Sequence, residues 1–255
     1  TAALPFVQFM ELIAPPDVPD DIGGRSLHRA NLLDVDHPSG TKYDGTGVTV
    51  MVRDDGPLGP HIDYQGRNTD VFDPSDTNNG THGDGVGGIM AGAGNLDPTM
   101  KGMAAGSDIF TIRYQADFQD NTMDLHFNEN VTITNSSYSN GCNAGYTTIA
   151  QTVEEQLQDN PTLMHVFSAG NSNGQDCGYG AGNQWGNITG GHKIAKNCIA
   201  TANLFVDGAL VGSSSRGPAH DGRLKPDIAA HGQNQNSTDH NNTYQVFGGT
   251  SGAAP

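Results

Sequence analysis

Short runs of β-branched and apolar residues recur along the chain and alternate with a helical pattern. In the run GVTVMVR, at 47–53, the three valines fall on alternate positions, which is the period of a β-strand with one buried face. The segment TTIAQTVEEQLQD instead repeats apolar residues at Ile149, Val153 and Leu157, the spacing of one helix face. Strands that alternate with helices favour an α/β fold with a mostly parallel sheet covered on both faces. Further strands are predicted at 107–114, 131–137, 163–170 and 197–204.

The length of 255 residues suits one mid-sized domain with a short extension. The Pro/Asp-rich stretch APPDVPDD follows a short apolar run near the N-terminus and is typical of a break between units. We therefore expect residues 1–25 to form an N-terminal extension and residues 26–255 to form the main domain. The 35 glycines permit frequent turns and close backbone approaches in that domain.

Acidic residues dominate the charge of the chain. Lys and Arg number 12 and Asp and Glu 28, so the formal net charge is −16. This charge disfavours binding to phosphate backbones and to anionic lipid, so neither nucleic acid nor a membrane is expected as a partner. The sequence contains no apolar run of about 18 residues, the length needed to span a bilayer. The first residues, TAAL, lack the basic-then-apolar pattern of a signal peptide, so we expect any leader to be absent from this chain.

The three cysteines divide into two kinds. Cys142 and Cys177 lie in loops rich in Gly and Asn, whereas Cys198 lies in the strand-like run CIATANL and is interpreted as a buried thiol. We expect a disulfide between Cys142 and Cys177. Such a bridge favours an oxidising, extracellular location, so the protein is expected to be secreted.

Two short motifs suggest other chemistry, and their contexts argue against both. Gly83, Gly85 and Gly88 satisfy GxGxxG, the fingerprint of a dinucleotide site, but the polar segment before them contains no strand to support a phosphate-binding turn. The segment 170–174, GNSNG, fits the GxSxG elbow of α/β-hydrolases with Ser172 as the nucleophile. That elbow must open a helix, and the Gly and Asn residues that follow form helices poorly. An esterase of the α/β-hydrolase type that uses Ser172 stays an alternative.

Four separated segments together contain the parts of a nucleophilic acyl-transfer site. A carboxylate ends one predicted strand, a histidine begins a stretch of small residues with helical pattern, an asparagine follows another strand, and a serine begins a final helix. In such chemistry Ser supplies the attacking oxygen, His accepts its proton, Asp orients the imidazole, and Asn donates to the developing oxyanion. The segments are 48–56, 82–92, 165–174 and 248–255.

The order Asp, His, Asn, Ser, with the residues around each, resembles the subtilisin-like serine proteases, peptidase family S8. The HGTHVAG block of that family falls on 82–88, its AAGN block on 169–171 and its GTSxAxP block on 249–255. The resemblance extends over residues 45–255. It implies a subtilisin-like three-layer α/β fold and a serine endopeptidase that hydrolyses polypeptide substrates through an acyl-enzyme intermediate, with no cofactor required for the chemistry. Residues 1–25 would then be an extension of the mature enzyme or a remnant of a propeptide.

The same resemblance assigns roles to individual residues. It implies a catalytic triad of Asp54, His82 and Ser251, with Asn171 as the oxyanion donor. The DxG register of the family selects Asp54 rather than Asp55. Because side chains alternate along a strand, Asp55 is expected to point away from the face of Asp54 and to have a structural role in the turn.

Three positions depart from the family pattern. Asp84 and Gly85 stand where the family usually has Thr and His. Asp84 is expected either to favour the charged imidazole or to face solvent. Gly252 replaces the larger residue that usually follows the serine.

The segment NSSYSNG, at 135–141, resembles the stretch that pairs with the substrate backbone in this family. The resemblance places Ser137, Tyr138 and Ser139 beside the substrate residue on the acyl side of the cleaved bond, the P1 residue. An ordinary strand at a loop edge is the alternative interpretation of this segment.

The protein is expected to act as a monomer.

A cluster of Asp70, Asp73 and Asp76 suggests a structural calcium site, because carboxylate oxygens are the ligands that Ca²⁺ prefers. The cluster lacks a defined ligand pattern, so a solvated acidic loop is the alternative. The absence of HExxH and of paired CxxC motifs argues against a catalytic zinc.

The resemblance also predicts more chain than this sequence contains. Members of the family continue well beyond the position of Pro255, so we expect the C-terminal part of the fold to be missing. A catalytically idle peptide-binding fragment is therefore a further alternative to an active peptidase.

Overall fold

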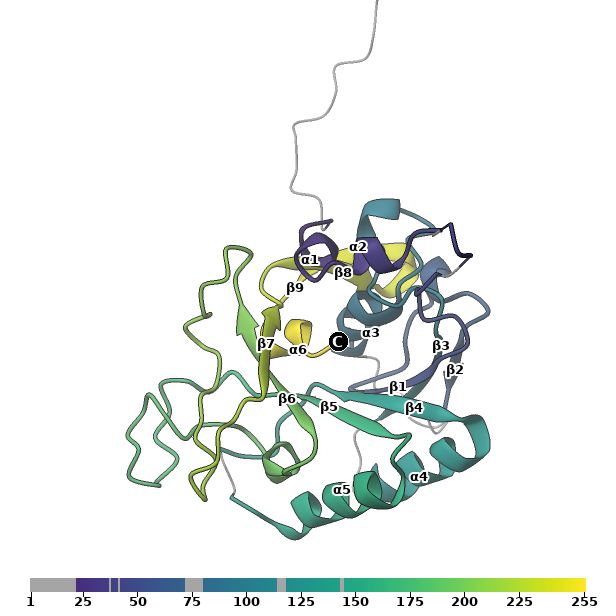
Figure 1. The fold of residues 1–255 in the computed structure, drawn as a ribbon. Coiled ribbons are helices and arrows are strands. Elements are labelled where there is room, and N and C mark those ends of the chain that lie inside the picture. Colours follow the sequence, from purple (N-terminus) through teal and green to yellow (C-terminus); the bar gives the residue numbers. More distant parts are fainter. Residues whose placement is uncertain (1–21, 37, 41, 72–79, 114–117, 143–144) are drawn as a thin grey trace, which may run out of the picture.

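A seven-stranded parallel sheet forms the centre of the protein (Figure 1), in the strand order β2-β3-β1-β4-β5-β6-β7. The computed structural model describes residues 22–36, 38–40, 42–71, 80–113, 118–142 and 145–255. Its strands are β1 (Thr49–Asp54), β2 (Asn68–Asp70), β3 (Asp108–Arg113), β4 (Val131–Ser136), β5 (Met164–Ser168), β6 (Ile199–Leu204) and β7 (Ile228–His231).

Helices cover both faces of this sheet, so the architecture has three layers (Figure 1). One face carries α3 and α6, with the antiparallel hairpin β8–β9 packed against α3, and the other carries α4 and α5. None of the described helices is both long and apolar enough to cross a membrane. The bounds are α1 (Ile22–Leu27), α2 (Ala30–Leu33), α3 (His82–Ala91), α4 (Phe118–Glu129), α5 (Thr148–Asp159), α6 (Thr250–Ala253), β8 (Gln235–Asp239) and β9 (Thr243–Phe247), with short 3-10 helices η1 (Ile62–Tyr64), η2 (Pro98–Met100), η3 (Gly191–Ile194) and η4 (His240–Asn242).

Alternation along β1 divides the hydrophobic core between the two faces. Val50 and Val52 pack with Val86 of α3, whereas Met51, between them, packs with Val153 of α5. Successive side chains of a strand point to opposite faces, so a central strand with apolar residues at consecutive positions must be covered on both. The predicted α/β fold with a mostly parallel sheet covered on both faces is confirmed.

The predicted helix over 147–159 is α5, with one difference in its buried face. Val153 and Leu157 are buried, but Ile149 is only half-buried and its neighbour Ala150 is fully buried instead. The first turn of α5 thus buries Ala150 rather than Ile149.

Strand β8 of the hairpin β8–β9 has no apolar strand signal in the sequence. Strand β8 reads QNSTD and contains no apolar residue, yet Ser237 and Thr238 are fully buried against α3. Ser237 Oγ donates to the Gly85 carbonyl oxygen (2.6 Å) and Thr238 Oγ1 donates to the Asp84 carbonyl oxygen (2.8 Å). Hydrogen bonds to the backbone of α3, rather than apolar side chains, hold β8 in place.

The expected boundary at residue 25 falls inside α1. Arg25 is buried, and its guanidinium pairs with Asp34 (2.8 Å) and donates to Asn31 Oδ1 (2.9 Å). Residues 1–21, most of the expected N-terminal extension, lie outside the described residues. The described part of that extension is bonded to the segment that follows it.

Two of the three cysteines form a disulfide, and the third is a free thiol. Cys142 and Cys177 form a disulfide that closes a loop of 35 residues in sequence. Cys198 is buried just before β6, and burial raises the pKa of its thiol to about 11. Because the thiolate is the reactive form, Cys198 acts as a buried structural residue.

We predict that Gly88→Ala lowers the free energy of unfolding by about 1–3 kcal/mol, the usual range for overpacking a core. A Cβ at Gly88 would lie 2.7 Å from the backbone nitrogen of Thr238 and would overlap both hydroxyls of β8 that face α3. Alanine is otherwise the better helix residue, so only this contact makes the change unfavourable. Denaturant unfolding of the variant and the wild type measures the difference.

Gly212→Ala is the matched control, because a Cβ at Gly212 meets no heavy atom within 4 Å. Its free energy of unfolding is expected to stay within about 0.5 kcal/mol of the wild type. Equal stability of both variants would contradict the close packing of β8 on α3.

Candidate active site

The carboxyl ends of three adjacent strands converge at one edge of the sheet. Asp54 ends β1, Ser137 follows β4, and Asn171 comes shortly after β5. In a parallel sheet these ends share an edge, which is where binding sites form in open α/β folds. The strand order β1-β4-β5 brings together residues from three distant parts of the chain.

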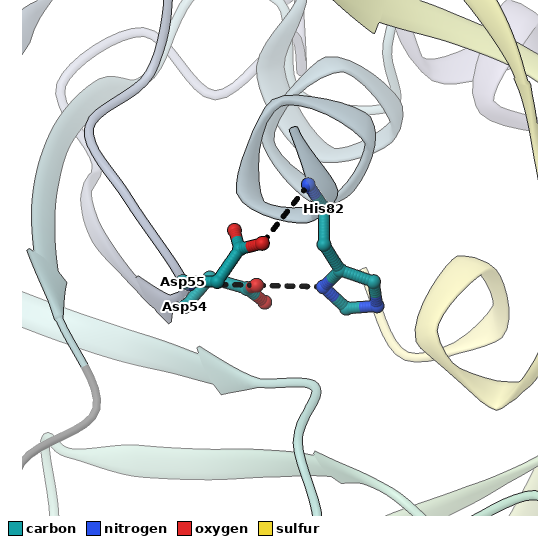
Figure 2. A group of neighbouring side chains, drawn as sticks. All are labelled: Asp54, Asp55 and His82. Carbon is teal, nitrogen blue, oxygen red and sulfur yellow. Dashed lines mark hydrogen bonds and ion pairs between the residues drawn. The ribbon is translucent and has the colours of Figure 1, made fainter. Parts of the chain in front are cut away.

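A buried carboxylate holds the imidazole of His82, the first residue of α3. His82 Nδ1 donates to Asp54 Oδ1 at 2.6 Å (Figure 2). The Asp54 side chain is 1% exposed, whereas the His82 side chain is 37% exposed. The imidazole is thus fixed at one nitrogen, and Figure 2 shows its other edge turned toward the yellow ribbon around α6.

Asp55 lies in the same cluster, contrary to the expectation that it points elsewhere. Its carboxylate accepts from the backbone N–H groups of Gly83 (2.8 Å) and His82 (3.4 Å), as Figure 2 shows for His82. The residue before α3, Thr81, makes no capping bond with its side chain. Asp55 therefore caps α3 from the end of β1, where a negative charge also favours the helix dipole.

The charges around His82 favour its protonated form. Burial of the ring opposes the charge, but the hydrogen bond and charge of Asp54, with the charge of Asp55, outweigh it and hold the pKa of His82 above its usual value. A base with this environment stabilises the imidazolium that forms when it accepts a proton.

Asp54, Asp55 and His82 also form a group close enough to hold a metal ion, with ligand atoms within 4.8 Å of one another. Each of these side chains is already bonded within the cluster or to the backbone of α3. An imidazole oriented by one carboxylate is equally the arrangement of a general base.

Ser251 lies in the first turn of α6, the short helix that contacts α3. Its hydroxyl donates to the carbonyl oxygen of Ser137 at 3.1 Å. The glycine after it is explained by packing, because a Cβ at Gly252 would lie 2.5 Å from the Gly232 carbonyl oxygen. The close approach of these two backbones sets the position of Ser251 against the sheet.

Asn171 is oriented by α6. Its Oδ1 accepts from the Thr250 backbone N–H at 2.9 Å. The side chain is exposed, and its Nδ2 amino group is the end that this hydrogen bond does not use. Gly249 permits the contact, since it has φ +82° and a Cβ there would lie 2.9 Å from Asn171 Nδ2. The Asn171 amide is therefore held by Thr250, the residue that directly precedes Ser251.

The predicted substrate-binding segment lies beside these groups. Ser137 is buried, Tyr138 is half-buried and Ser139 is exposed. The Ser137 backbone contacts Ser251 directly, as above, and Ser139 Oγ hydrogen-bonds the Thr189 hydroxyl at 2.5 Å. The segment therefore forms one side of the site.

Asp84 differs from both expectations for it. It is fully buried, with Oδ1 accepting from the Gly59 backbone N–H (2.6 Å) and Oδ2 lying 2.7 Å from His240 Nε2. Burial, together with neighbouring carboxylates, raises its pKa to about 8. Asp84 thus joins α3 to η4 rather than facing solvent or His82.

The structure gives no support to the two alternative motifs. Gly83, Gly85 and Gly88 lie within α3, where Gly85 and Gly88 allow close packing against β8 and β9. Ser172 lies in a loop, where its backbone N–H donates to Ser215 Oγ (2.9 Å), and turns rather than a helix follow it. Neither a phosphate-binding turn nor a nucleophile elbow forms.

Of the candidate calcium ligands, Asp73 and Asp76 lie outside the described residues. Asp70 ends β2 and is exposed, and its Oδ1 accepts from Asn68 Nδ2 at 3.0 Å. One surface carboxylate does not define a calcium site, so no chemistry is assigned to this ion.

The fold is shared with solved structures of proteases. The "Structure of Prenylagaramide maturation protease PagA" matches with a TM-score of 0.68 and 19% identity, covering 91% of this chain and 76% of the other. The "Crystal structure of a cold adapted subtilisin-like serine proteinase" matches with a TM-score of 0.64 and 19% identity, covering 93% of this chain and 82% of the other. At this identity the likeness concerns the fold alone.

Sequence comparisons add the family. No curated protein matches the sequence of the chain. The model of the subtilase family matches residues 45–255, which include every residue of the candidate site described above. The chain therefore belongs to the subtilase family of serine peptidases.

Proposed function

We propose that the protein is a secreted endopeptidase that hydrolyses polypeptides through an acyl-enzyme intermediate formed on Ser251. The observation that carries this proposal is the 2.6 Å hydrogen bond between buried Asp54 and Nδ1 of His82. It leaves Nε2 of the ring as the proton acceptor on the edge turned toward α6. The disulfide of Cys142 and Cys177 supports an extracellular location.

Attack begins when the Ser251 hydroxyl leaves the Ser137 carbonyl oxygen and rotates toward His82. His82 Nε2 then takes the hydroxyl proton as Ser251 Oγ bonds to the carbonyl carbon of the substrate. Asp54 keeps the ring in the required tautomer and stabilises the resulting imidazolium. The Ser137 carbonyl oxygen, freed of its bond, becomes available to a backbone N–H of the substrate.

The negative charge that develops on the substrate oxygen is met by two donors. Asn171 Nδ2 is one, since its amide oxygen is already occupied by the Thr250 N–H. The backbone N–H of Ser251, in the first turn of α6, is the other. Both donors are fixed before the substrate binds, which makes stabilisation of the oxyanion efficient.

Collapse of the tetrahedral intermediate breaks the C–N bond, and the imidazolium of His82 gives its proton to the leaving amine. Water then attacks the Ser251 ester with His82 again as the base. The second tetrahedral intermediate releases the carboxylic acid and restores the Ser251 hydroxyl. The segment 137–139 supports an extended substrate along this path, because it flanks the nucleophile at its backbone.

A sulfonyl fluoride is expected to label Ser251, and Ser251→Ala is expected to abolish both labelling and peptide hydrolysis. Asn171→Ala is expected to lower kcat by about 100-fold or more, the effect known for the corresponding donor of subtilisin. Mass spectrometry of the labelled chain and steady-state peptide hydrolysis measure these outcomes.

Ser172→Ala is the matched control, because Ser172 lies next to Asn171 and is expected to keep full activity and labelling. Labelling at Ser172 instead would favour the esterase alternative. Stable peptide binding without any turnover or labelling would favour an idle peptide-binding protein and contradict the proposal.

We also predict that Asp55→Asn shifts the acidic limb of the kcat/KM profile to lower pH. Loss of the Asp55 charge removes one of the interactions that raise the pKa of His82, so the ring becomes the neutral base at a lower pH. The amide oxygen of Asn can still accept from the Gly83 N–H and cap α3.

Asp207→Asn serves as the control for this pH profile. Asp207 is an exposed turn residue that accepts from the Ala209 N–H, and its replacement removes the same charge elsewhere in the chain. An unchanged or upward-shifted limb in Asp55→Asn would show that Asp55 does not act on His82.

A further inference from the structure

Lys193 is a buried cation without a counterion in the described part of the chain. It lies in η3 with its side chain fully buried, and no described carboxylate forms an ion pair with it. A buried charge of this kind is costly, and burial lowers the pKa of Lys193 to about 7. Lys225, also buried, shows the usual solution, because its ammonium pairs with Asp227 at 2.6 Å.

Three hydroxyls surround the Lys193 ammonium in place of a carboxylate. Nζ donates to Thr189 Oγ1 (3.1 Å), Ser139 Oγ (3.3 Å) and Ser168 Oγ (3.4 Å). Hydroxyl groups accept these hydrogen bonds but do not neutralise the charge. The ammonium therefore has hydrogen-bond acceptors but no described counterion.

These hydroxyls belong to the segments that border the candidate active site. Ser139 ends the segment whose first residue contacts the Ser251 hydroxyl, and Ser168 ends β5 just before Asn171. Thr189 is bonded to the same stretch, since its backbone N–H donates to the Ala169 carbonyl oxygen at 3.1 Å. A side chain at Gly170 would overlap the Thr189 hydroxyl, so this contact is close.

The position of a bound peptide follows from the catalytic groups. Its reacting carbon must approach Ser251 Oγ to about 3 Å, with its oxygen directed to Asn171. The peptide then runs between the segments 137–139 and 169–171, and its P1 side chain faces the bonded pair of hydroxyls of Ser139 and Thr189. Ser139 is the exposed residue of this pair, and the Lys193 ammonium lies 3.3 Å from its hydroxyl oxygen. A polar P1 group therefore reaches Ser139 before Lys193.

The charged and titratable groups near Tyr138 are Arg53 and His192, with Asp54 as the acidic neighbour on the His82 side of the site. Arg53 is buried in β1 with its guanidinium carbon 5.7 Å from the centre of the Tyr138 ring, and the His192 ring lies 5.3 Å from the same centre. Burial, with the charges of Lys193 and Arg53, keeps the pKa of His192 well below its usual value. His192 is therefore neutral, and Lys193 and Arg53 are the cations on this side of the site in a protein of formal net charge −16. An anion is the P1 group that these two cations favour.

We propose that Lys193 makes the peptidase select Glu or Asp as the P1 residue of its substrates. The inference rests on the proposed function and adds a substrate class to it. The carboxylate of the P1 side chain supplies the missing counterion: it accepts a hydrogen bond from Ser139 Oγ and replaces one of the three hydroxyl acceptors of Lys193 Nζ. An amide of the same shape would leave the ammonium unpaired.

The test is a set of peptides that differ only at P1, with Glu, Gln or Leu there. Wild-type kcat/KM is expected to favour Glu over Gln by roughly 10- to 100-fold, the range for a buried hydrogen bond to a charged group. In Lys193→Met the ratio of Glu to Gln is expected to fall to about one, with faster cleavage at Leu, because the charge is replaced by an apolar side chain of similar length. Lys225→Met, which removes the other buried lysine, is expected to keep the wild-type ratio.

Equal cleavage at Glu and Gln by the wild type would overturn the inference and leave the peptidase proposal standing. Retention of the Glu preference in folded Lys193→Met would overturn it as well. If Lys193→Met does not fold, the test uses the ratio of kcat/KM for Glu over Gln in the wild type and in Ser139→Ala. This ratio is expected to be lower in Ser139→Ala, and an unchanged ratio would overturn the inference. A wild-type protein that neither cleaves any peptide nor reacts with a sulfonyl fluoride at Ser251 would overturn the proposed function, and this inference with it.

Discussion

The parallel alignment of β1, β4 and β5 is the constraint on which the candidate site depends. In a parallel sheet every strand ends at the same edge, so Asp54, Ser137 and Asn171 meet although the chain between them makes four crossovers, from β1 through β2, β3 and β4 to β5. An antiparallel strand at any of these places would carry its polar end to the opposite edge. The helices then add His82 and Ser251 from the face that α3 and α6 share.

The sequence predicts five strands of the central sheet because apolar and β-branched side chains mark them, as Val50 and Val52 do in β1. It does not predict the short edge strands β2 and β7. It misses β8 because Ser237 and Thr238 are buried through hydrogen bonds to α3, which leave no apolar pattern. It also misplaces Asp55, since strand alternation stops at Asp54 and the turn that follows directs the Asp55 carboxylate back to α3. Periodicity predicts side-chain direction only while the strand continues.

Charge is the property of the site that the sequence shows least. Lys193 is one of 12 basic residues in an acidic chain, and the segment GGHKIAK around it has no distinguishing pattern. The crossover between β5 and β6 buries η3 beside the segment 137–139, and no described carboxylate forms an ion pair with Lys193 there. Only the fold shows that Arg53, from a distant part of the chain, lies near it too.

Glycine contacts hold α6, which carries Ser251, the proposed nucleophile. Gly252 allows the backbone of α6 to touch Gly232, and Gly249 allows the turn before it to touch Asn171. Both contacts join backbone to backbone or to an amide, so they leave little freedom for α6 to shift along the sheet. The same contact with Asn171 occupies its oxygen and frees its amino group. The packing that holds Ser251 in place therefore also determines which end of Asn171 can face the substrate oxygen.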